Sequence, residues 1–497
     1  MEIKNGQLLP TAQIEVDTYA VFYDKMIRLS EAQSNHCLCY FAKPQGDSFK
    51  LFAFIANDAT HSIEALAATV KNGEVLRSLT AERPALHTFE REMHEAWGIE
   101  FIGHPWLKPL RYSHDRTQCN SIYDYPFFNI ESEEFHRVGV GPIHAGIIEP
   151  GHFRFICEGE KIHHLEIQLG WQHRGVEKLM TSLAKPLQLA TLSENIAGDT
   201  VVGHACTFAQ TVEALAGIEV DEQLKLERTI ALEQERIAIH TGDLSAICTD
   251  VAYQLGSAVF GRLRTPMINF FQKWCGNRFA KGLIRPGKTN FHFTKALADD
   301  WQKTIDAYKP HFREMADLTF DLPSVLSRIE RTGIVSTELA QNIGLVGMAA
   351  KASGLKRDVR ASHPSLVYAQ LGVDPVVQTS GDVYARAKMR RDEIEQSIDL
   401  IEKLIPKVAD NISDQYEPMP QLTFEPNSTV ITMVEGWRGM ICHVAQSDAN
   451  GQLETYKIVD PSVHNWLGLA MAVRGNGISD FPICNKSFDL SYCGHDL

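Results

Sequence analysis

The chain has 497 residues, a formal net charge of -14 at pH 7, 44% hydrophobic residues and 22% charged residues. This length and composition predict a globular protein with more than one domain. The acidic balance argues against nucleic-acid binding, which needs clustered Lys and Arg to displace counterions. No apolar run approaches the roughly 18 residues of a membrane-spanning helix, and the N-terminal residues lack the features of a signal peptide, so we expect a cytoplasmic protein.

The 10 cysteines are scattered, and none stands in a Cys-x-x-Cys spacing. That spacing is the commonest one for zinc and iron-sulfur ligands. We therefore expect most of these cysteines to be small buried side chains. Cys37 and Cys39 would share one face of a strand, where packing is the expected role.

The first part of the chain predicts a small mixed α/β domain. Turn residues at 43–47 separate two strand-like runs and indicate a hairpin. The expected elements are a helix over 17–33, strands over 37–41 and 49–55, a helix over 62–70 and a short helix over 90–97.

A polar and aromatic stretch without periodicity, residues 110–138, predicts a linker between domains. Beyond it the patterns predict two strands, then a mainly helical region, then strands again around a hairpin turn at 448–451. The strands are expected over 151–169 and 422–460, and the helices over 191–216, 220–256, 296–318 and 382–405. The predicted fold class is therefore α+β.

Residues 488–497 read Phe-Asp-Leu-Ser-Tyr-Cys-Gly-His-Asp-Leu. This ending resembles that of [NiFe]-hydrogenase large subunits, Asp-Pro-Cys-x-x-Cys-x-x-His/Arg. The two Cys positions fall on Ser491 and Gly494, and Cys493 lies one position out of register. Thiolates are the ligands that select such a metal pair, and neither serine nor glycine provides one.

Residues 193–204 resemble the other ligand segment of that family, Arg-x-Cys-Gly-x-Cys-x-x-x-His. The Cys positions become Ala197 and Thr200, whereas Gly198 and His204 match the pattern. The resemblance therefore implies that all four metal-ligand positions lack sulfur, and no metal is expected on this chain.

Several other segments resemble the same family in the same order, and one resembles a second protein. Residues 89–105 resemble the C subunit of complex I. The implied layout is a C-like domain over 1–125 fused to a D-like domain over 126–497, as in the large subunit of formate hydrogenlyase. The second domain would resemble a [NiFe]-hydrogenase large subunit and would be mainly helical with small β-sheets. The segments that resemble hydrogenase and complex I D subunits are 141–155, 173–179, 352–364, 381–386 and 435–439.

The resemblance implies a set of polar residues around the former metal cavity, although 357–360 alone would indicate only a surface ion-pair cluster. Glu177 is expected to act in a proton path. A divalent metal at Glu177 is the lesser alternative, since Leu497 stands where a second ligand would be. The cavity-lining candidates are His144, His152, His204, Arg357, Asp358 and Arg360.

The function implied is that of a subunit of a membrane-associated oxidoreductase complex that couples electron transfer to ion translocation without a [NiFe] site. No cofactor is expected on this chain. Iron-sulfur clusters would lie in partner subunits: a small complex I B-like subunit and a ferredoxin-like subunit, together with antiporter-like membrane subunits. The expected location is the cytoplasmic face of the inner membrane.

Two alternatives stay open. The first is quinone reduction, as in complex I. His144 matches one polar quinone contact of that family, whereas the Tyr that offers a phenol to the quinone aligns with Ile196. The second is a structural scaffold without chemistry of its own.

Overall fold

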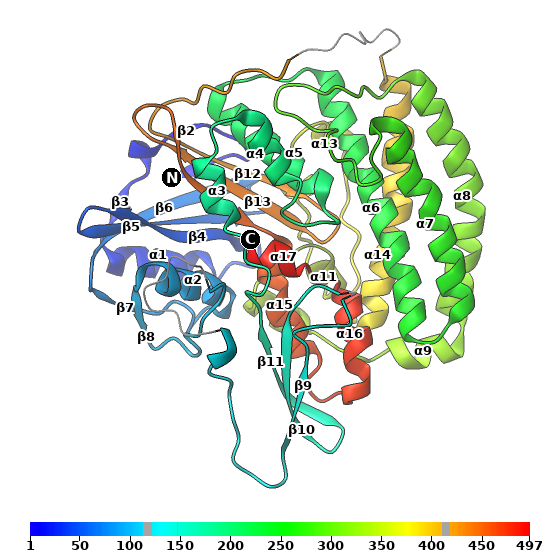
Figure 1. Cartoon of the computed structure of the whole chain (residues 1–497), viewed down its shortest axis with the longest axis horizontal. Coiled ribbons are helices and arrows are strands. Elements are labelled where there is room, and N and C mark those ends of the chain that lie inside the picture. Colours follow the sequence, from blue (N-terminus) through cyan, green and yellow to red (C-terminus); the bar gives the residue numbers. More distant parts are fainter. Residues whose placement is uncertain (113–121, 147, 410–417) are drawn as a thin grey trace.

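The computed structural model describes residues 1–112, 122–146, 148–409 and 418–497. Figure 1 shows a sheet-rich side, in blue and orange, beside a bundle of long helices in green and yellow. This arrangement confirms the α+β class. The predicted linker over 110–138 lies partly outside the described residues, and its described part contains a 3-10 turn at Ile122–Asp124 and the start of a strand at His136.

The N-terminal sheet has the strand order β1-β6-β5-β4, and β3 pairs with β6. The predicted hairpin is confirmed by antiparallel pairing of its two long strands, β4 and β5. The helices α1 (Tyr19–Leu29) and α2 (His87–Trp97) lie against this sheet (Figure 1). The strands are β1 (Glu2–Ile3), β3 (Val16–Asp17), β4 (Asn35–Gln45), β5 (Ser48–Asn57), β6 (Ser62–Lys71), and the separate pair β7 (Val75–Arg77) and β8 (Glu100–Ile102).

The helix predicted over 62–70 is wrong, because these residues form strand β6. An alanine-rich segment has good intrinsic helix propensity, but β6 pairs with β5 along its whole length and with β1 and β3 on its other edge. Buried alanines at 65, 67 and 68 also fit the crowded centre of the sheet. Tertiary pairing therefore overrides the local preference.

The N-terminal strand β2 (Leu9–Pro10) belongs to a different sheet, because it pairs with β12. That sheet has the order β14-β13-β12-β2, and its hairpins confirm the strands predicted over 422–460. Core side chains of both sheets, among them Phe54 and Val444, form one apolar cluster. The C-terminal strands are β12 (Ser428–Glu435), β13 (Met440–Ser447) and β14 (Leu453–Val459).

The helices expected over 191–216, 220–256, 296–318 and 382–405 are confirmed with two interruptions, and one long helix, α7, was not predicted. The helix expected over 220–256 ends at Asp250, and Ala252 adopts a left-handed φ of 59° before the next helix begins. The helix expected over 191–216 breaks at 194–200. There the Arg174 guanidinium donates hydrogen bonds to the carbonyls of Asn195 and Ile196, which would accept backbone N–H groups in a continuous helix. The helices are α4 (Pro186–Ser193), α5 (Val201–Ala216), α6 (Glu222–Asp250), α7 (Gln254–Cys275), α8 (Lys295–Asp321) and α14 (Val383–Leu404).

A third sheet, β11-β10-β9, projects from the lower side in Figure 1. It confirms the strands predicted over 151–169. Its strands are β9 (His136–Val140), β10 (His152–Glu158) and β11 (Lys161–Gln168). The short helices are α3 (Val176–Ser182), α9 (Pro323–Ile329), α10 (Thr337–Asn342), α11 (Gly347–Ala352), α12 (Val359–Ser362), α13 (Tyr368–Leu371), α15 (Pro461–Ala472), α16 (Phe481–Phe488) and α17 (Tyr492–Asp496).

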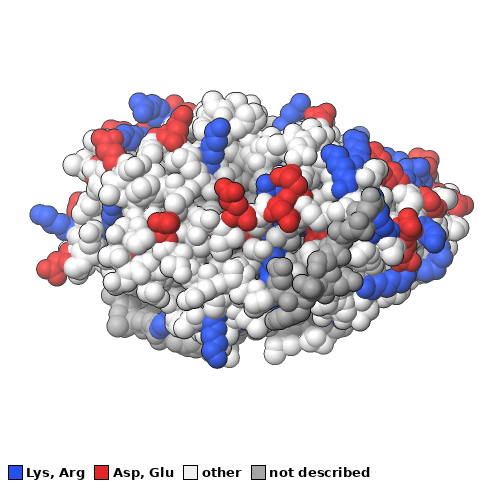
Figure 2. Space-filling view, turned by 90° about the horizontal axis from the view of Figure 1, so that it is seen from above, with Lys and Arg blue, Asp and Glu red and all other residues white. Residues whose placement is uncertain are grey.

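The surface in Figure 2 carries Lys and Arg beside Asp and Glu near both ends, with uncharged residues over much of the middle. No continuous basic stripe crosses the described residues of this face. Within the described ranges, no helix has both the length and the apolar character needed to cross a bilayer.

Candidate functional site

The structure brings together the two segments that resemble hydrogenase ligand segments. Residues 194–200 precede α5, and Ser491 is the N-cap of α17 near the end of the chain. Arg174 joins the segments, because its Nη2 donates to the carbonyl of Ile196 at 2.9 Å and to that of Cys493 at 3.1 Å. Positions almost 300 residues apart in the sequence thus meet beside one guanidinium.

A second arginine lies between the same segments. The Arg438 guanidinium donates two hydrogen bonds of 2.6 Å to the Asp199 carboxylate and one of 3.1 Å to Thr200 Oγ1. Its Nε donates to the carbonyl of Asp489. Burial opposes the charge of Arg438, but Asp199 raises its pKa above the ordinary value. A bidentate ion pair therefore occupies the place between the two segments.

Gly494 is packed too tightly for a larger side chain. A Cβ atom there would lie 2.7 Å from Asp460 Cγ and 2.9 Å from Ser491 Oγ. Ser491 Oγ itself accepts a hydrogen bond from the Gly494 N–H at 2.9 Å. The side chains at these positions and at Ala197 and Thr200 contain no thiolate, so this donor set does not fit a nickel-iron pair.

Cys493, the nearest thiol, is buried, and burial raises its pKa to about 11. It is therefore a neutral thiol near pH 7, which is a weak metal ligand. Within the described parts of the chain, no group of three or more His, Cys, Asp or Glu side chains is arranged to hold a metal ion.

His204 forms the centre of a buried chain of hydrogen bonds. Its Nε2 lies 2.9 Å from Asp460 Oδ2, and its Nδ1 lies 3.2 Å from His443 Nε2. His443 Nδ1 in turn lies 2.8 Å from the Tyr456 hydroxyl. Each member can donate or accept a proton. The hydrogen bonds therefore run from Asp460, which packs against Gly494, to Tyr456 on strand β14.

Asp358 and Arg360, which were predicted to line a cavity, belong to a buried cluster of charges. Asp358 is the N-cap of α12, and Arg360 on that helix contacts it at 2.7 Å and Glu233 of α6 at 3.1 Å. The cluster contains three cations and four anions from α6, α11, α12, α14 and β12. Its members are Glu233, Arg236, Lys351, Asp358, Arg360, Glu393 and Glu435.

Lys351 lies at the centre of this cluster. Its Nζ is 2.6 Å from Glu393, 2.9 Å from Asp358 and 3.4 Å from Glu435. His240 extends the cluster, since its Nε2 is 2.9 Å from Glu393. Buried charges persist only when such partners compensate for lost hydration.

The acids of the cluster divide into ionised and protonatable groups. Burial would raise the pKa of Asp358, but Arg360 and Lys351 lower it below the ordinary range. Lys351 likewise outweighs burial at Glu393, whose pKa lies well below the ordinary value. Burial, and then the neighbouring Asp358, raises the pKa of Glu435 to about 7. With four acids and three bases, one protonated acid makes the cluster neutral, and the raised pKa makes Glu435 the acid of the cluster that takes up a proton most readily.

The turn between β12 and β13 connects the cluster to the Asp199 ion pair. Glu435 at its start faces Lys351, whereas Arg438 near its end holds Asp199. Arg236 donates to the carbonyl of Glu435 at 2.8 Å. Glu235 lies close to this region, with Oε1 2.7 Å from the Val202 N–H, and burial raises its pKa to about 8. Burial thus raises the pKa of two acids, one at the start of the turn and one against the start of α5.

The other expected site residues lie elsewhere. Glu177 on α3 contacts Lys457 Nζ at 2.6 Å, so an ammonium group lies beside this carboxylate. His144 and His152 lie at the start of the β9–β10 sheet, where they contact the carbonyls of Gly151 and Gly141. Their catalytic roles stay predictions.

Arg357 is separated from its sequence neighbour. Asp358 has an extended backbone, and adjacent side chains in extended backbone point to opposite sides. The Arg357 guanidinium consequently reaches the carbonyl of Leu345 at 2.8 Å and faces the N-terminal domain. The structure therefore does not bring Arg357 into the cluster of Asp358 and Arg360.

Sequence reasoning missed several members of the cluster. Glu233, Arg236 and His240 recur every three or four residues on α6 and are buried. Charged residues at that spacing on the inner face of a long helix are a signal that the sequence contained. Lys351 and Glu393 gave no such signal, because they pair across separate helices.

Comparisons with known proteins agree with this architecture. Residues 13–119 match the family model for the respiratory-chain NADH dehydrogenase 30 Kd subunit, and residues 255–422 match that for the 49 Kd subunit. The chain thus joins sequence of these two kinds.

Curated relatives match most of the chain. The chain is 30% identical over 392 residues to the fused C/D subunit of NADH-quinone oxidoreductase from Bacteroides thetaiotaomicron, covering 71% of this chain and 72% of that protein. It is 27% identical over 434 residues to formate hydrogenlyase subunit 5 of Escherichia coli, covering 84% and 76%. It is also 27% identical over 355 residues to the carbon monoxide-induced hydrogenase of Rhodospirillum rubrum, covering 71% and 97%. The chain belongs to the family that joins the fused C/D subunits of NADH-quinone oxidoreductase with the large subunits of energy-converting hydrogenases.

Proposed function

We propose that this chain is the large subunit of a membrane-associated oxidoreductase complex that couples electron transfer to ion translocation without a [NiFe] centre. Family membership supports the oxidoreductase complex. The absence of thiolate donors at Ala197, Thr200, Ser491 and Gly494 supports chemistry without nickel. Electrons would pass through iron-sulfur clusters of partner subunits, and the protonation of the buried charged cluster of this chain would change in response.

One observation carries the proposal: the turn between β12 and β13 places buried Glu435 against Lys351 and buried Arg438 against Asp199, so one short segment contacts both groups. A change of charge near Arg438 would alter the field at Glu435, whose pKa of about 7 allows it to gain or lose a proton. The coupling step that we propose is therefore proton exchange between the buried Glu435 carboxyl and groups of the complex that are in contact with solvent.

The partners proposed for this complex are a small iron-sulfur subunit resembling the complex I B subunit, a ferredoxin-like subunit and antiporter-like membrane subunits. The chain would lie on the cytoplasmic face of the inner membrane, held there by these subunits. The helices of the described ranges are too short or too polar to span a bilayer, which is consistent with a peripheral position.

The first test is to purify the native complex and measure nickel and iron per copy of this chain. We expect iron from partner clusters and no stoichiometric nickel; one nickel per chain would refute the nickel-free site. In parallel, protons translocated per electron pair are measured in membrane vesicles for Glu435→Gln. We expect that ratio to fall, with electron transfer retained.

The matched control is Glu395→Gln. Glu395 lies on α14 like Glu393, but it pairs with Arg313 at the surface. Equal proton-to-electron ratios for Glu435→Gln, Glu395→Gln and the unmodified complex would refute the coupling role of the cluster.

A second candidate function, quinone reduction, is favoured by one contact. Tyr492 lies beside His144, with ring centroids 6.5 Å apart, so a phenol and an imidazole meet although Ile196 offers no hydroxyl. A phenol and an imidazole could hydrogen-bond the two oxygens of a quinone. Tyr492→Phe should then raise the KM for a soluble quinone analogue, whereas an unchanged KM would leave this candidate without support.

A further inference from the structure

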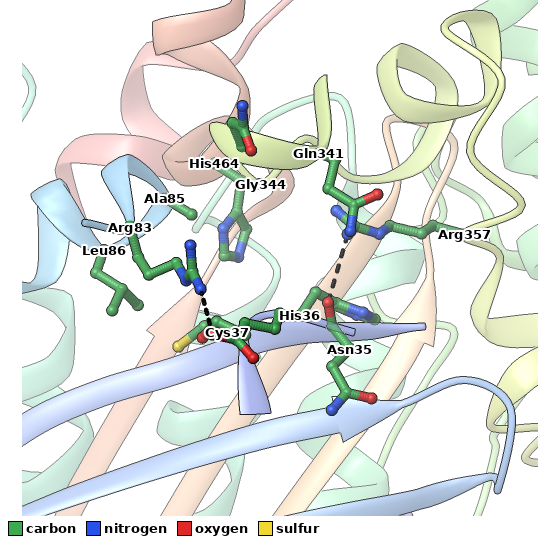
Figure 3. Close-up of a pocket in the computed structure, with 13 residues that line it drawn as sticks. Asn35, His36, Cys37, Arg83, Ala85, Leu86, Gln341, Gly344, Arg357 and His464 are labelled. Atoms are coloured by element: carbon green, nitrogen blue, oxygen red, sulfur yellow. Dashed lines mark hydrogen bonds and ion pairs between the residues drawn. The ribbon is translucent and has the colours of Figure 1, made fainter. Parts of the chain in front are cut away.

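A cavity of about 190 Å³ lies between the N-terminal domain and the helical domain (Figure 3). It is large enough for a small organic ion and not only for one water molecule. Its walls come from the turn after α1, the start of β4, the 3-10 helix at Pro84–Leu86, and helices α10 and α15. Its polar lining residues include Asn35, His36, Arg83, Gln341, Arg357 and His464.

Arg357 is a buried cation in one wall, with a relative exposure of 6%. Its guanidinium donates to the carbonyls of Leu345 at 2.8 Å and Asn35 at 3.5 Å, and its Nε contacts no acceptor among the described residues. It forms no ion pair with a described carboxylate within 4.0 Å; Asp58 acts on it only from a greater distance. Burial lowers the pKa of Arg357 to about 10, because no contacting carboxylate makes up for the lost hydration of its charge.

A second guanidinium faces it from the other side. In Figure 3, Arg83 and Arg357 extend toward the cavity from opposite sides, with the His464 ring between them. Arg83 donates at 3.4 Å to two backbone carbonyls, and its Nε also lacks a partner among the described residues. His464 is buried, and its Nε2 likewise has none.

The two histidines of the cavity are uncharged near pH 7. Burial lowers the pKa of His464 to about 3 and that of His36 to about 4. His464 can therefore donate one hydrogen bond without adding charge. Asp58 lies behind His36, at 3.6 Å from its Nδ1, and is outside the lining of the cavity.

We propose that this cavity binds a small anion that carries a carboxylate or phosphate group. The two guanidinium groups would hold its charged oxygens, and His464 Nε2 and Gln341 would contact its remaining polar atoms. A guanidinium offers several donors in a plane, which matches both kinds of oxyanion. Because Arg357 lacks a contacting carboxylate, an anion would supply the charge compensation that a buried cation requires.

Among the described residues that line the cavity, Glu31 has the only carboxylate. It is exposed and lies 3.6 Å from Arg83 Nη2, as a loose surface pair. A bound anion would compete with Glu31 for Arg83. Removal of this carboxylate should therefore strengthen anion binding, whereas removal of Arg83 should weaken it.

The test is isothermal titration calorimetry of the full chain with inorganic phosphate and, separately, with succinate. Sodium chloride of equal ionic strength serves as the background. We expect saturable binding of one equivalent of at least one probe, and the preferred probe tells which oxyanion the cavity favours. Heat that does not exceed the chloride background for either probe would overturn the proposal.

Variants locate the site. Arg83→Gln and Arg357→Gln should each weaken binding by about tenfold or more, and Glu31→Gln should tighten it. The control is Arg313→Gln, which removes a surface guanidinium paired with Glu395 far along α8. If Arg357→Gln does not fold, the two partly exposed positions decide the outcome: Arg83→Gln and Glu31→Gln affinities equal to that of Arg313→Gln would also overturn the proposal.

Discussion

Replacing Glu435 by Gln should change how the stability of this protein depends on pH. The Glu435 carboxyl is buried between Lys351 and the Val359 N–H, and burial raises its pKa to about 7 from the ordinary value of 4.5. Gln has nearly the same shape and cannot ionise. The substitution therefore removes the titration while keeping an acceptor for Val359.

The sign and the size follow from this pKa. The folded chain holds the Glu435 proton more tightly than the unfolded chain does, so the stabilisation is fully present below pH 4.5 and is lost as the pH rises toward 7. A difference of 2.5 units corresponds to about 3 kcal/mol of unfolding free energy. Glu435→Gln should lose less stability between pH 5 and pH 8, by up to about that amount.

The assay is urea unfolding of the full chain at several pH values, compared with Glu395→Gln as the surface control. Other groups with raised pKa, such as Glu235, titrate in every variant and cancel in the comparison. An identical pH dependence for Glu435→Gln and the unmodified chain would show that Glu435 is ionised throughout, and the proton assignment within the cluster would be wrong.

Three further substitutions test other parts of the structure. Lys457→Met leaves the carboxylate of Glu177 without its ammonium partner and should lower the free energy of unfolding in urea by about 3 to 5 kcal/mol. The control Lys273→Met, at an exposed pair, should lower it by no more than about 1 kcal/mol. Equal losses would contradict the buried pairing. Tyr456→Phe removes the hydroxyl beside His443 and should lower stability by about 1 kcal/mol and slow turnover of the complex. Unchanged turnover would exclude a proton path from His443 through Tyr456. Gly494→Ala should cost about 1 to 3 kcal/mol, because its Cβ would meet Asp460, and a neutral result would mean that this region is loosely packed.

Local patterns were sufficient for much of the fold. The β4–β5 hairpin, helices α1, α8 and α14, and the strands around the 448–451 turn follow from periodicity and turn residues, because these features depend on neighbours in the sequence. Ordered resemblance also paired the 193–204 and 488–497 segments, which Arg174 joins in the structure.

Local patterns failed where distant segments set the conformation. Residues 62–70 have the composition of a helix, but pairing on both edges makes them a strand. Asp250 ends a helix that the apolar stripe alone would continue. For residues 62–70 the decisive contacts come from strands elsewhere in the sequence, whereas the helix ends at a left-handed Ala252 that periodicity does not reveal.

The residue types at Ala197, Thr200, Ser491 and Gly494 can be read without any structure, and they already limit the metal chemistry that their side chains can support. Folding was needed to show that Asp358 joins a buried cluster whereas Arg357, its neighbour, faces a cavity at the domain boundary. The physical reason is that the energy of a buried charge depends on which partners surround it. Those partners come from several helices and strands that lie far apart along the chain and meet only in the folded protein.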